Sequence, residues 1–130
     1  MINLKKEGVL MRRCTISLIL IFFLLTIGNK CLAQQIIPWD NADAYYGQFV
    51  TVEGTIAVTY YSGEACFLNF HSTGDRYFTA VIFRSDFHKF PHQPEQYYNG
   101  KKVHVTGFVK QLGGKPAIIL NDPSQIKILQ

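Results

Sequence analysis

The sequence predicts an all-β domain, a small and strongly curved five-stranded barrel with a short helix at its N-terminal side. Apolar and polar residues alternate over much of residues 49–129, which is the period of half-buried strands. Two long alternating stretches each contain a glycine, Gly54 or Gly107, at an inward position. A glycine inside a strand marks a bulge or sharp bend, and strongly curved barrels require such bends.

Residues 1–33 have the composition of a secretory signal peptide. Basic residues come first, an apolar run extends from Ile16 to Ile27, and small residues precede a predicted cleavage site after Ala33. A membrane anchor is the alternative, but the run is shorter than the roughly 20 residues of a spanning helix. A lipoprotein site at Cys31 and a start at Met11 stay open. We therefore expect export, periplasmic or secreted, and a mature domain over residues 34–130 that does not span a membrane.

The predicted mature domain differs in charge from the whole chain. The full sequence has a formal net charge of +4. Residues 1–33 carry this excess, because residues 34–130 contain eight Lys or Arg and eight Asp or Glu. Tight binding to a phosphate backbone normally relies on an excess of Lys and Arg. Within the mature domain, only a local basic patch could supply that excess.

A short helix is predicted at the start of the mature domain, over residues 38–47. Asp40 is a candidate N-cap, and Gly47 suits a left-handed C-terminal stop. We expect this helix to lay Trp39 and Tyr46 on the body of the domain.

The first three strands follow the helix. The first extends from Phe49 to Tyr61, and its predicted inward residues are Val50, Val52, Ile56, Val58 and Tyr60. Residues 65–70 and 77–84 are predicted to form a hairpin around the turn at 71–76. In this hairpin the predicted core residues are Cys66, Leu68, Phe70, Phe78, Ala80 and Ile82. For residues 77–84 the opposite face, formed by Tyr77, Thr79, Val81 and Phe83, is the alternative. Residues 85–100 show no clean period, so we expect a loop with at most one helical turn.

The C-terminal part supplies the remaining strands. Residues 101–110 alternate with valines inward, the Gly113-Gly114 pair predicts a tight hairpin, and residues 117–120 form the fifth strand. A turn at 121–124 leads to a last short strand at 126–129. A helix, a three-stranded meander, an irregular connection and a two-stranded unit are the chain plan of an OB fold, a five-stranded Greek-key barrel.

Three runs of the sequence also carry a family resemblance. They are "YYGQFVTVEGTIAVTY", "FLNFHSTGDRYFTAVIFRSDFHKFP" and "YYNGKKVHVTGFVKQLGGKPAIILNDPSQIKIL". Together they resemble bacterial exported OB-fold domains of the nucleic-acid-binding type, found alone behind a signal peptide or attached to secreted nucleases. The resemblance covers nearly all of residues 38–129. It implies the OB fold, and it implies function only loosely, because OB barrels bind single strands, oligosaccharides, proteins and small ligands.

Strand alternation predicts which side chains face outward. An outward row of three aromatic residues, with cations nearby in the sequence, resembles the sheet face on which OB proteins stack bases. We therefore predict a single-stranded nucleic-acid interface formed by Phe67, Asn69, Tyr77, Arg84, Phe108, Lys110 and Lys115. The alternative is that the N-terminal helix and the 85–98 loop cover these aromatic rings.

The sequence contains no convincing catalytic constellation. His88 and His92 could form a metal site with Asp86, but Pro91 makes a regular helix across them unfavourable, and we expect solvated loop residues. Cys66 is predicted to be a small buried hydrophobe, with a reactive or intermolecularly bonded thiol as the alternative. We predict a non-enzymatic binding protein without metal or cofactor. The second hypothesis is an envelope adaptor that binds a protein partner, such as a nuclease, or a glycan.

Overall fold

A computed structural model describes residues 34–73 and 76–129 of the chain. The predicted signal peptide lies outside the described residues. The region Gln34–Gln130 forms a compact unit by itself. In the described part, no helix combines the length and the apolar composition that crossing a membrane requires.

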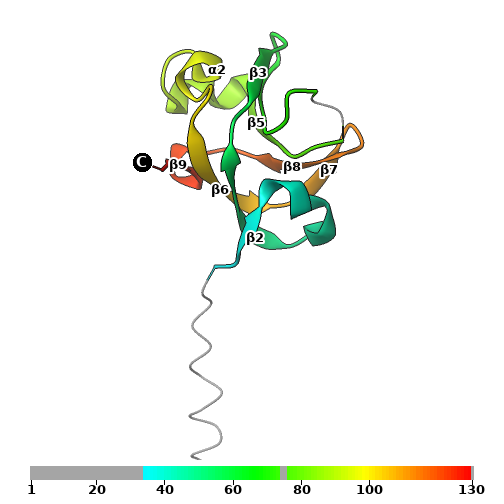
Figure 1. Cartoon of the computed structure of the whole chain (residues 1–130). Coiled ribbons are helices and arrows are strands. Elements are labelled where there is room, and N and C mark those ends of the chain that lie inside the picture. Colours follow the sequence, from blue (N-terminus) through cyan, green and yellow to red (C-terminus); the bar gives the residue numbers. More distant parts are fainter. Residues whose placement is uncertain (1–33, 74–75, 130) are drawn as a thin grey trace, which may run out of the picture. The chain divides into compact units, whose positions relative to one another are not determined.

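The described strands form two sheets (Figure 1). The first has the order β1-β2-β6-β9 and consists of β1 (Ile36–Pro38), β2 (Phe49–Thr55), β6 (Lys102–Phe108) and β9 (Ile126–Ile128). The second has the order β3-β4-β5-β8-β7 and consists of β3 (Val58–Tyr61), β4 (Ala65–Asn69), β5 (Thr79–Phe83), β7 (Lys110–Leu112) and β8 (Lys115–Ile119). We call them the β2–β6 sheet and the β4–β5 sheet after their central antiparallel pairs.

The strand pairing confirms the predicted all-β OB fold. β2 and β3 are halves of one long strand that passes from the first sheet into the second, and β6 and β7 do the same around Val109. The antiparallel meander β3-β4-β5 then pairs with β8 in parallel. The five OB strands are therefore β2–β3, β4, β5, β6–β7 and β8. The short strands β1 and β9 extend the β2–β6 sheet at its two edges.

Gly54 and Gly107 stand where other side chains approach the long strands. A Cβ atom at Gly54 would lie 2.6 Å from Trp39 Cδ1 and 2.7 Å from Phe70 Cδ1. At Gly107 it would lie 2.7 Å from Ile118 Cγ2. The predicted bend is observed two residues beyond Gly54, at residues 56–57, where β2 ends and β3 has not begun. Only glycine fits these two contacts without a shift of the neighbours.

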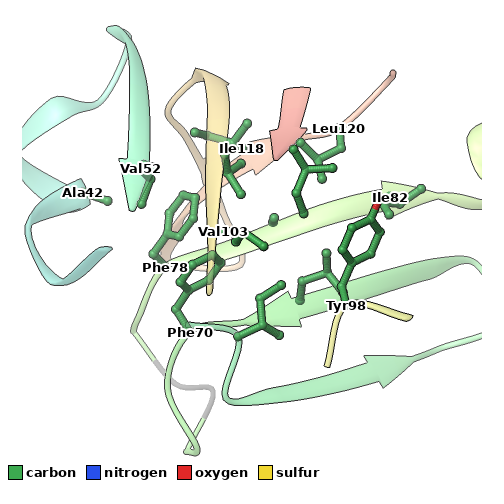
Figure 2. Close-up of a cluster of buried hydrophobic side chains, with 14 of the residues drawn as sticks. Ala42, Val52, Phe70, Phe78, Ile82, Tyr98, Val103, Ile118 and Leu120 are labelled. Carbon is green, nitrogen blue, oxygen red and sulfur yellow. The ribbon is translucent and has the colours of Figure 1, made fainter. Parts of the chain in front are cut away.

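One hydrophobic cluster draws on both sheets and forms the core (Figure 2). It contains predicted inward residues from the first four OB strands, among them Val50, Val52, Ile56, Cys66, Leu68, Phe70, Phe78, Ala80, Ile82, Val103, Val105 and Val109. Ile118 and Leu120, for which no inward face was predicted, complete it from the fifth strand region. Burial raises the pKa of the Cys66 thiol to about 12, and the charge of Glu95 adds to this shift. The thiol is therefore protonated at neutral pH, and the prediction that Cys66 is a buried hydrophobe is confirmed.

The second half of the first long strand departs from the prediction. Alternation from Val50 onward predicts Val58 and Tyr60 inward, but both side chains are exposed, Tyr60 by 61%. The alternation is interrupted because residues 56–57 lie between two strands that belong to different sheets. Tyr60 consequently lies on the outside of the domain.

The N-terminal helix η1 (Trp39–Tyr45) is a 3₁₀ helix. Its N-cap is Pro38, so the prediction of Asp40 as the cap is wrong. Trp39 and Tyr45 pack against the core, whereas Tyr46 is exposed, contrary to expectation. Three residues per turn explain the difference, because they place positions 39, 42 and 45 on one face. The left-handed stop at Gly47 is confirmed, with φ at 77°.

The connection between β5 and β6 contains two short helices where at most one helical turn was predicted. They are η2 (Arg84–Lys89) and α2 (Pro94–Tyr97). Phe90 and Tyr98, which follow the two helices, are buried in the core and anchor them. Burial raises the pKa of the Tyr98 hydroxyl to about 12, with a further contribution from Tyr97. One buried aromatic residue after each helix thus fixes the connection to the core, although the sequence of the connection shows no regular hydrophobic period.

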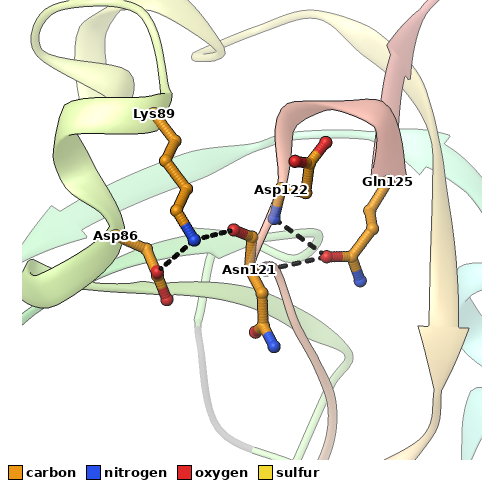
Figure 3. Close-up of polar contacts among 5 residues, drawn as sticks. All are labelled: Asp86, Lys89, Asn121, Asp122 and Gln125. Carbon is orange, nitrogen blue, oxygen red and sulfur yellow. Dashed lines mark hydrogen bonds and ion pairs between the residues drawn. The ribbon is translucent and has the colours of Figure 1, made fainter.

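Polar contacts tie η2 to the C-terminal turn (Figure 3). Lys89 Nζ lies 3.0 Å from Asp86 Oδ1 and donates to the carbonyl oxygen of Asn121 at 3.2 Å. The turn continues into η3 (Pro123–Gln125), where Asp122 and Gln125 form a capping box. The Ser124 backbone N–H and hydroxyl lower the pKa of the Asp122 carboxyl. The predicted turn at 121–124 is confirmed by these contacts.

Candidate functional site

The outer face of the β4–β5 sheet contains the largest part of the predicted interface. Cross-strand pairing places Tyr60, Phe67 and Val81 in one row. A second row consists of Val58, Asn69, Thr79, Ala117 and Lys110. OB folds bind their ligands on the face of the second and third OB strands, here β4 and β5, and on the adjoining loops. We call this outer surface the β4–β5 face.

Two aromatic rings and a cation meet on the β4–β5 face. Tyr60 and Phe67 are direct cross-strand partners, with ring centroids 6.2 Å apart and planes inclined by 27°. Lys115 Nζ lies 5.8 Å from the centroid of the Phe67 ring, within cation–π range. Flat rings with a cation beside them are the combination that single-strand-binding OB proteins use.

A small apolar cluster lies beneath these rings. Its buried members are Ala65, Val81 and Ala117, and Phe67 and Leu112 pack against it. Val81 and Thr79 belong to the outward set of β5, yet both are fully buried. Phe67 and Leu112 pack against the cluster that contains Val81 and contribute to its burial. Phe67 is held by this packing and keeps part of its ring exposed.

Asn69 also lies on the β4–β5 face, but its expected exposure is wrong. Its side chain is only 8% exposed, and its Oδ1 atom is buried without a hydrogen-bond partner among the described residues. The neighbouring Thr79 hydroxyl instead donates to the carbonyl oxygen of Leu68 at 3.3 Å. A buried acceptor without a donor costs about 1–3 kcal/mol. This face therefore carries an uncompensated polar group.

The predicted row of three aromatic residues is divided among three separate ring clusters. Phe67 pairs with Tyr60. Tyr77 stacks on His71 with centroids 4.0 Å apart and meets the edge of Trp39 at 5.8 Å. Phe108 pairs with Phe49 across the β2–β6 sheet at 5.1 Å. Of the three predicted rings, only Tyr77 contacts the N-terminal helix, through Trp39.

The predicted cations are placed unequally. Lys110 and Lys115 lie on β7 and β8, within the β4–β5 sheet. Arg84 is exposed at the first position of η2, beyond the end of β5. The structure thus adds Tyr60 to Phe67 and Lys115 and separates Phe108 from them. Sequence reasoning missed Tyr60 because it continued the alternation of β2 through the strand break.

The β2–β6 sheet carries a different set of charges. Glu53 Oε2 lies 2.9 Å from His104 Nε2, and Glu53 Oε1 lies 3.4 Å from Lys102 Nζ. The His104 ring and the Lys102 ammonium lower the pKa of the Glu53 carboxyl, although desolvation opposes them. His104 and Lys102 therefore both contact the Glu53 carboxylate on this sheet.

The histidines of the η2–α2 connection are not gathered into a site. His88 and His92 are exposed, and Asp86 is paired with Lys89. Across residues 34–73 and 76–129, no three His, Cys, Asp or Glu side chains are grouped so that they could hold a metal ion.

Comparisons with known proteins bear on the fold. No protein-family model and no curated protein matches the chain. Among solved structures, the asparaginyl-tRNA synthetase from Pyrococcus horikoshii matches with a TM-score of 0.50 and 15% identity, over 72% of this chain and 23% of that one. The aspartyl tRNA synthetase from Entamoeba histolytica matches with a TM-score of 0.50 and 14% identity, over 75% of this chain and 22% of that one. This chain thus spans under a quarter of each synthetase, and the likeness shows the OB fold alone.

Proposed function

We propose that this chain is an exported, non-enzymatic OB-fold protein that binds single-stranded nucleic acid weakly through its β4–β5 face. The observation that carries this proposal is the stacked Tyr60–Phe67 pair with the Lys115 ammonium over the Phe67 ring. The likeness to tRNA synthetases supports it, because these enzymes are named for a nucleic-acid substrate.

The chemistry of the face fits a single strand. Unpaired bases expose flat faces that stack on Phe67 and Tyr60, and each such contact contributes about 1–3 kcal/mol. Lys110 and Lys115 supply positive charge for the phosphates. Weak binding follows from the balanced charge of residues 34–130, because few phosphates can be neutralised.

The proposal is tested by fluorescence anisotropy with labelled single-stranded oligonucleotides at low salt. The protein is expressed from the full chain and purified. We expect saturable binding that weakens in Phe67→Leu and is unchanged in Phe108→Leu, the matched exposed ring on the other sheet. Absence of saturable binding at high micromolar protein would overturn the proposal, and so would equal losses in the two variants.

Export requires its own test. The full chain is expressed in a bacterial host, and the intact mass of the protein is measured in the cytoplasmic, periplasmic and medium fractions. We expect the processed form, cut after Ala33, outside the cytoplasm. An uncut chain that stays in the cytoplasm would contradict export and leave the binding proposal standing.

A specific observation favours the adaptor as a second candidate function. Ile36, Phe49 and Phe108 are each exposed by more than half and lie on one outer face of the β2–β6 sheet. An exposed apolar group of this kind suits a protein partner. Recovery of a stable partner from the envelope fraction after nuclease treatment, with its loss in Phe49→Ser and Phe108→Ser, would favour the adaptor.

A further inference from the structure

The ring cluster around Tyr77 borders a pocket beyond the Asn69–Thr79 end of β4 and β5. The pocket measures about 240 Å³, and its lining includes Trp39, Asp40, Asp43, Arg76, Tyr77 and Pro116. Helix η1, the residues before β5 and strand β8 contribute these side chains. None of the proposed contacts on the β4–β5 face uses this pocket.

Aromatic rings give the pocket flat walls. Tyr77 is stacked on His71 at an interplanar angle of 24°, and Trp39 lies 5.8 Å and 5.9 Å from the two rings. Trp39 is held in place from behind, because only the missing side chain of Gly54 leaves room for its ring. Such walls accept a planar ring by stacking.

The polar groups of the pocket determine which planar ring fits. Asp40 and Asp43 are three residues apart in a 3₁₀ helix, so their side chains lie on the same side of it. Ionised carboxylates only accept hydrogen bonds. Neither carboxylate has a hydrogen bond or ion pair to another described residue. A ligand that presents N–H or O–H donors beside a flat face would therefore complement these exposed carboxylates.

From this combination, we propose that the pocket binds a guanine base. Guanine carries two adjacent donors, N1–H and the N2 amino group, on one edge, and these match the two oxygens of a carboxylate. Cytosine and adenine offer one amino group each. Uracil and thymine offer a single N–H between two carbonyl oxygens, which a carboxylate repels. Arg76 lies in the pocket wall, where its guanidinium can meet the phosphate of the same nucleotide.

The pocket continues the β4–β5 face. His71 and Tyr77 each lie two residues beyond the paired residues Asn69 and Thr79, on the outward parity of their strands. Phe67 and His71 are four residues apart, which corresponds to about 13 Å along an extended chain. A single strand stacked on Phe67 could therefore deliver a guanine to the pocket. This strand-bound form rests on the proposed function, whereas a free guanine nucleotide could occupy the pocket without it.

Trp39 provides a direct test, because it is the only tryptophan of the chain and lies in the pocket wall. The protein expressed from the full chain is titrated with GMP and with UMP while the fluorescence of Trp39 is recorded. The excitation wavelength is chosen longer than those that the bases absorb. We expect saturable quenching by GMP and at least about tenfold weaker binding of UMP, the discrimination typical of a bidentate contact. Absence of quenching, or equal binding of the two nucleotides, would overturn the inference.

Variants identify the contacts. Asp40→Asn with Asp43→Asn should weaken GMP binding about tenfold and remove the preference over UMP. Glu64→Gln, an exposed acid in the β3–β4 loop, is the matched control and should change nothing. Preserved GMP preference in the double variant would contradict the assigned role of the carboxylates.

A second arm separates the two sources of guanine. Labelled oligonucleotides ending in G or U are compared in the wild type and in Phe67→Leu. Tighter binding of the G-ending strand, lost in Phe67→Leu while GMP still quenches Trp39, supports the strand-bound form. Oligonucleotide binding without a GMP effect overturns the pocket and leaves the proposed function intact. A GMP effect without oligonucleotide binding overturns the proposed function and assigns the pocket to the free nucleotide.

Discussion

The two sheets of this domain each expose a cross-strand pair of aromatic rings, but the pairs differ in arrangement and surroundings. Tyr60 and Phe67 on the β4–β5 sheet are inclined by 27° with an ammonium over one ring. Phe49 and Phe108 on the β2–β6 sheet meet edge to face at 68°, and no cation of the described residues lies over either ring. Only the first pair offers a cation beside ring faces that are nearly parallel.

Charges follow the same division. On the β2–β6 sheet, Glu53, His104 and Lys102 satisfy one another. On the β4–β5 sheet, Lys115 approaches an aromatic ring, and Asn69 Oδ1 lacks a partner among the described residues. Exposure of aromatic residues alone therefore does not identify a binding face. The neighbouring polar groups also differ between the sheets: one has an ion-paired carboxylate, and the other has a cation over a ring and a buried amide oxygen.

Substitution of the two ring pairs tests this contrast with the largest expected effect. Tyr60→Leu and Phe67→Leu should each weaken single-strand binding by about 1–3 kcal/mol, because a leucine cannot stack a base. Phe49→Leu and Phe108→Leu, the matched changes on the other sheet, should leave the affinity unchanged. Anisotropy titrations of the four variants measure the difference. Equal losses for both pairs would remove the distinction between the faces.

The buried polar groups of the two faces should respond in opposite directions. Thr51 is buried, and its hydroxyl lies 2.8 Å from that of Thr106, so Thr51→Val should lower the free energy of unfolding by about 1 kcal/mol. Asn69→Leu removes an acceptor that has no donor and should leave that free energy equal or raise it by about 1 kcal/mol. Urea denaturation measures both. A loss in Asn69→Leu as large as in Thr51→Val would show that the amide holds the fold together.

Much of the fold could be predicted from the sequence because its signals are local. The Gly113-Gly114 hairpin is an example, since both residues have positive φ, at 59° and 80°, as a tight two-residue turn requires. Gly54 and Gly107 identified the long curved strands. The 3₁₀ character of η1 and the anchoring of η2 and α2 by Phe90 and Tyr98 could not be predicted, because they depend on contacts with distant strands.

The candidate site was less predictable than the fold. Parity within one strand correctly assigned the core side of β5, but it does not specify which strands become neighbours. Tyr60, Phe67 and Lys115 come together through the pairing of β3 with β4 and the placement of β8. Phe108 also has outward parity in its own strand, but it lies on β6, which belongs to the β2–β6 sheet. Asn69 has outward parity but is buried, which parity within its own strand does not show.

The lysines of the two faces provide a smaller, salt-dependent test. Lys115→Ala should reduce the slope of log affinity against log salt by about one, because one fewer counterion is released from the strand. Lys102→Ala should leave the slope unchanged, since Lys102 lies on β6, in the sheet that the proposed strand does not contact. Titrations at several salt concentrations measure both slopes. A change of slope in Lys102→Ala alone would assign the phosphate contacts to the β2–β6 sheet.

The smallest expected effect concerns the ion cluster of the β2–β6 sheet. Because His104 and Lys102 hold the folded-state pKa of Glu53 below its unfolded value, this cluster stabilises the fold above the unfolded pKa. That contribution is lost as the pH falls through the folded-state pKa. Glu53→Gln should therefore slightly lower the melting temperature at neutral pH, and the difference from the wild type should vanish in strong acid.

Thermal unfolding followed by circular dichroism across this pH range measures the effect. Glu64→Gln, a change at an exposed acid, is the control and should leave the dependence of the melting temperature on pH unchanged. The shift should be small because exposed ion pairs contribute little. A difference between Glu53→Gln and the wild type that persists in strong acid would mean that Glu53 acts through packing and not through its charge. Oligonucleotide binding by Glu53→Gln should equal that of the wild type, since the cluster lies outside the β4–β5 face that we propose contacts the strand.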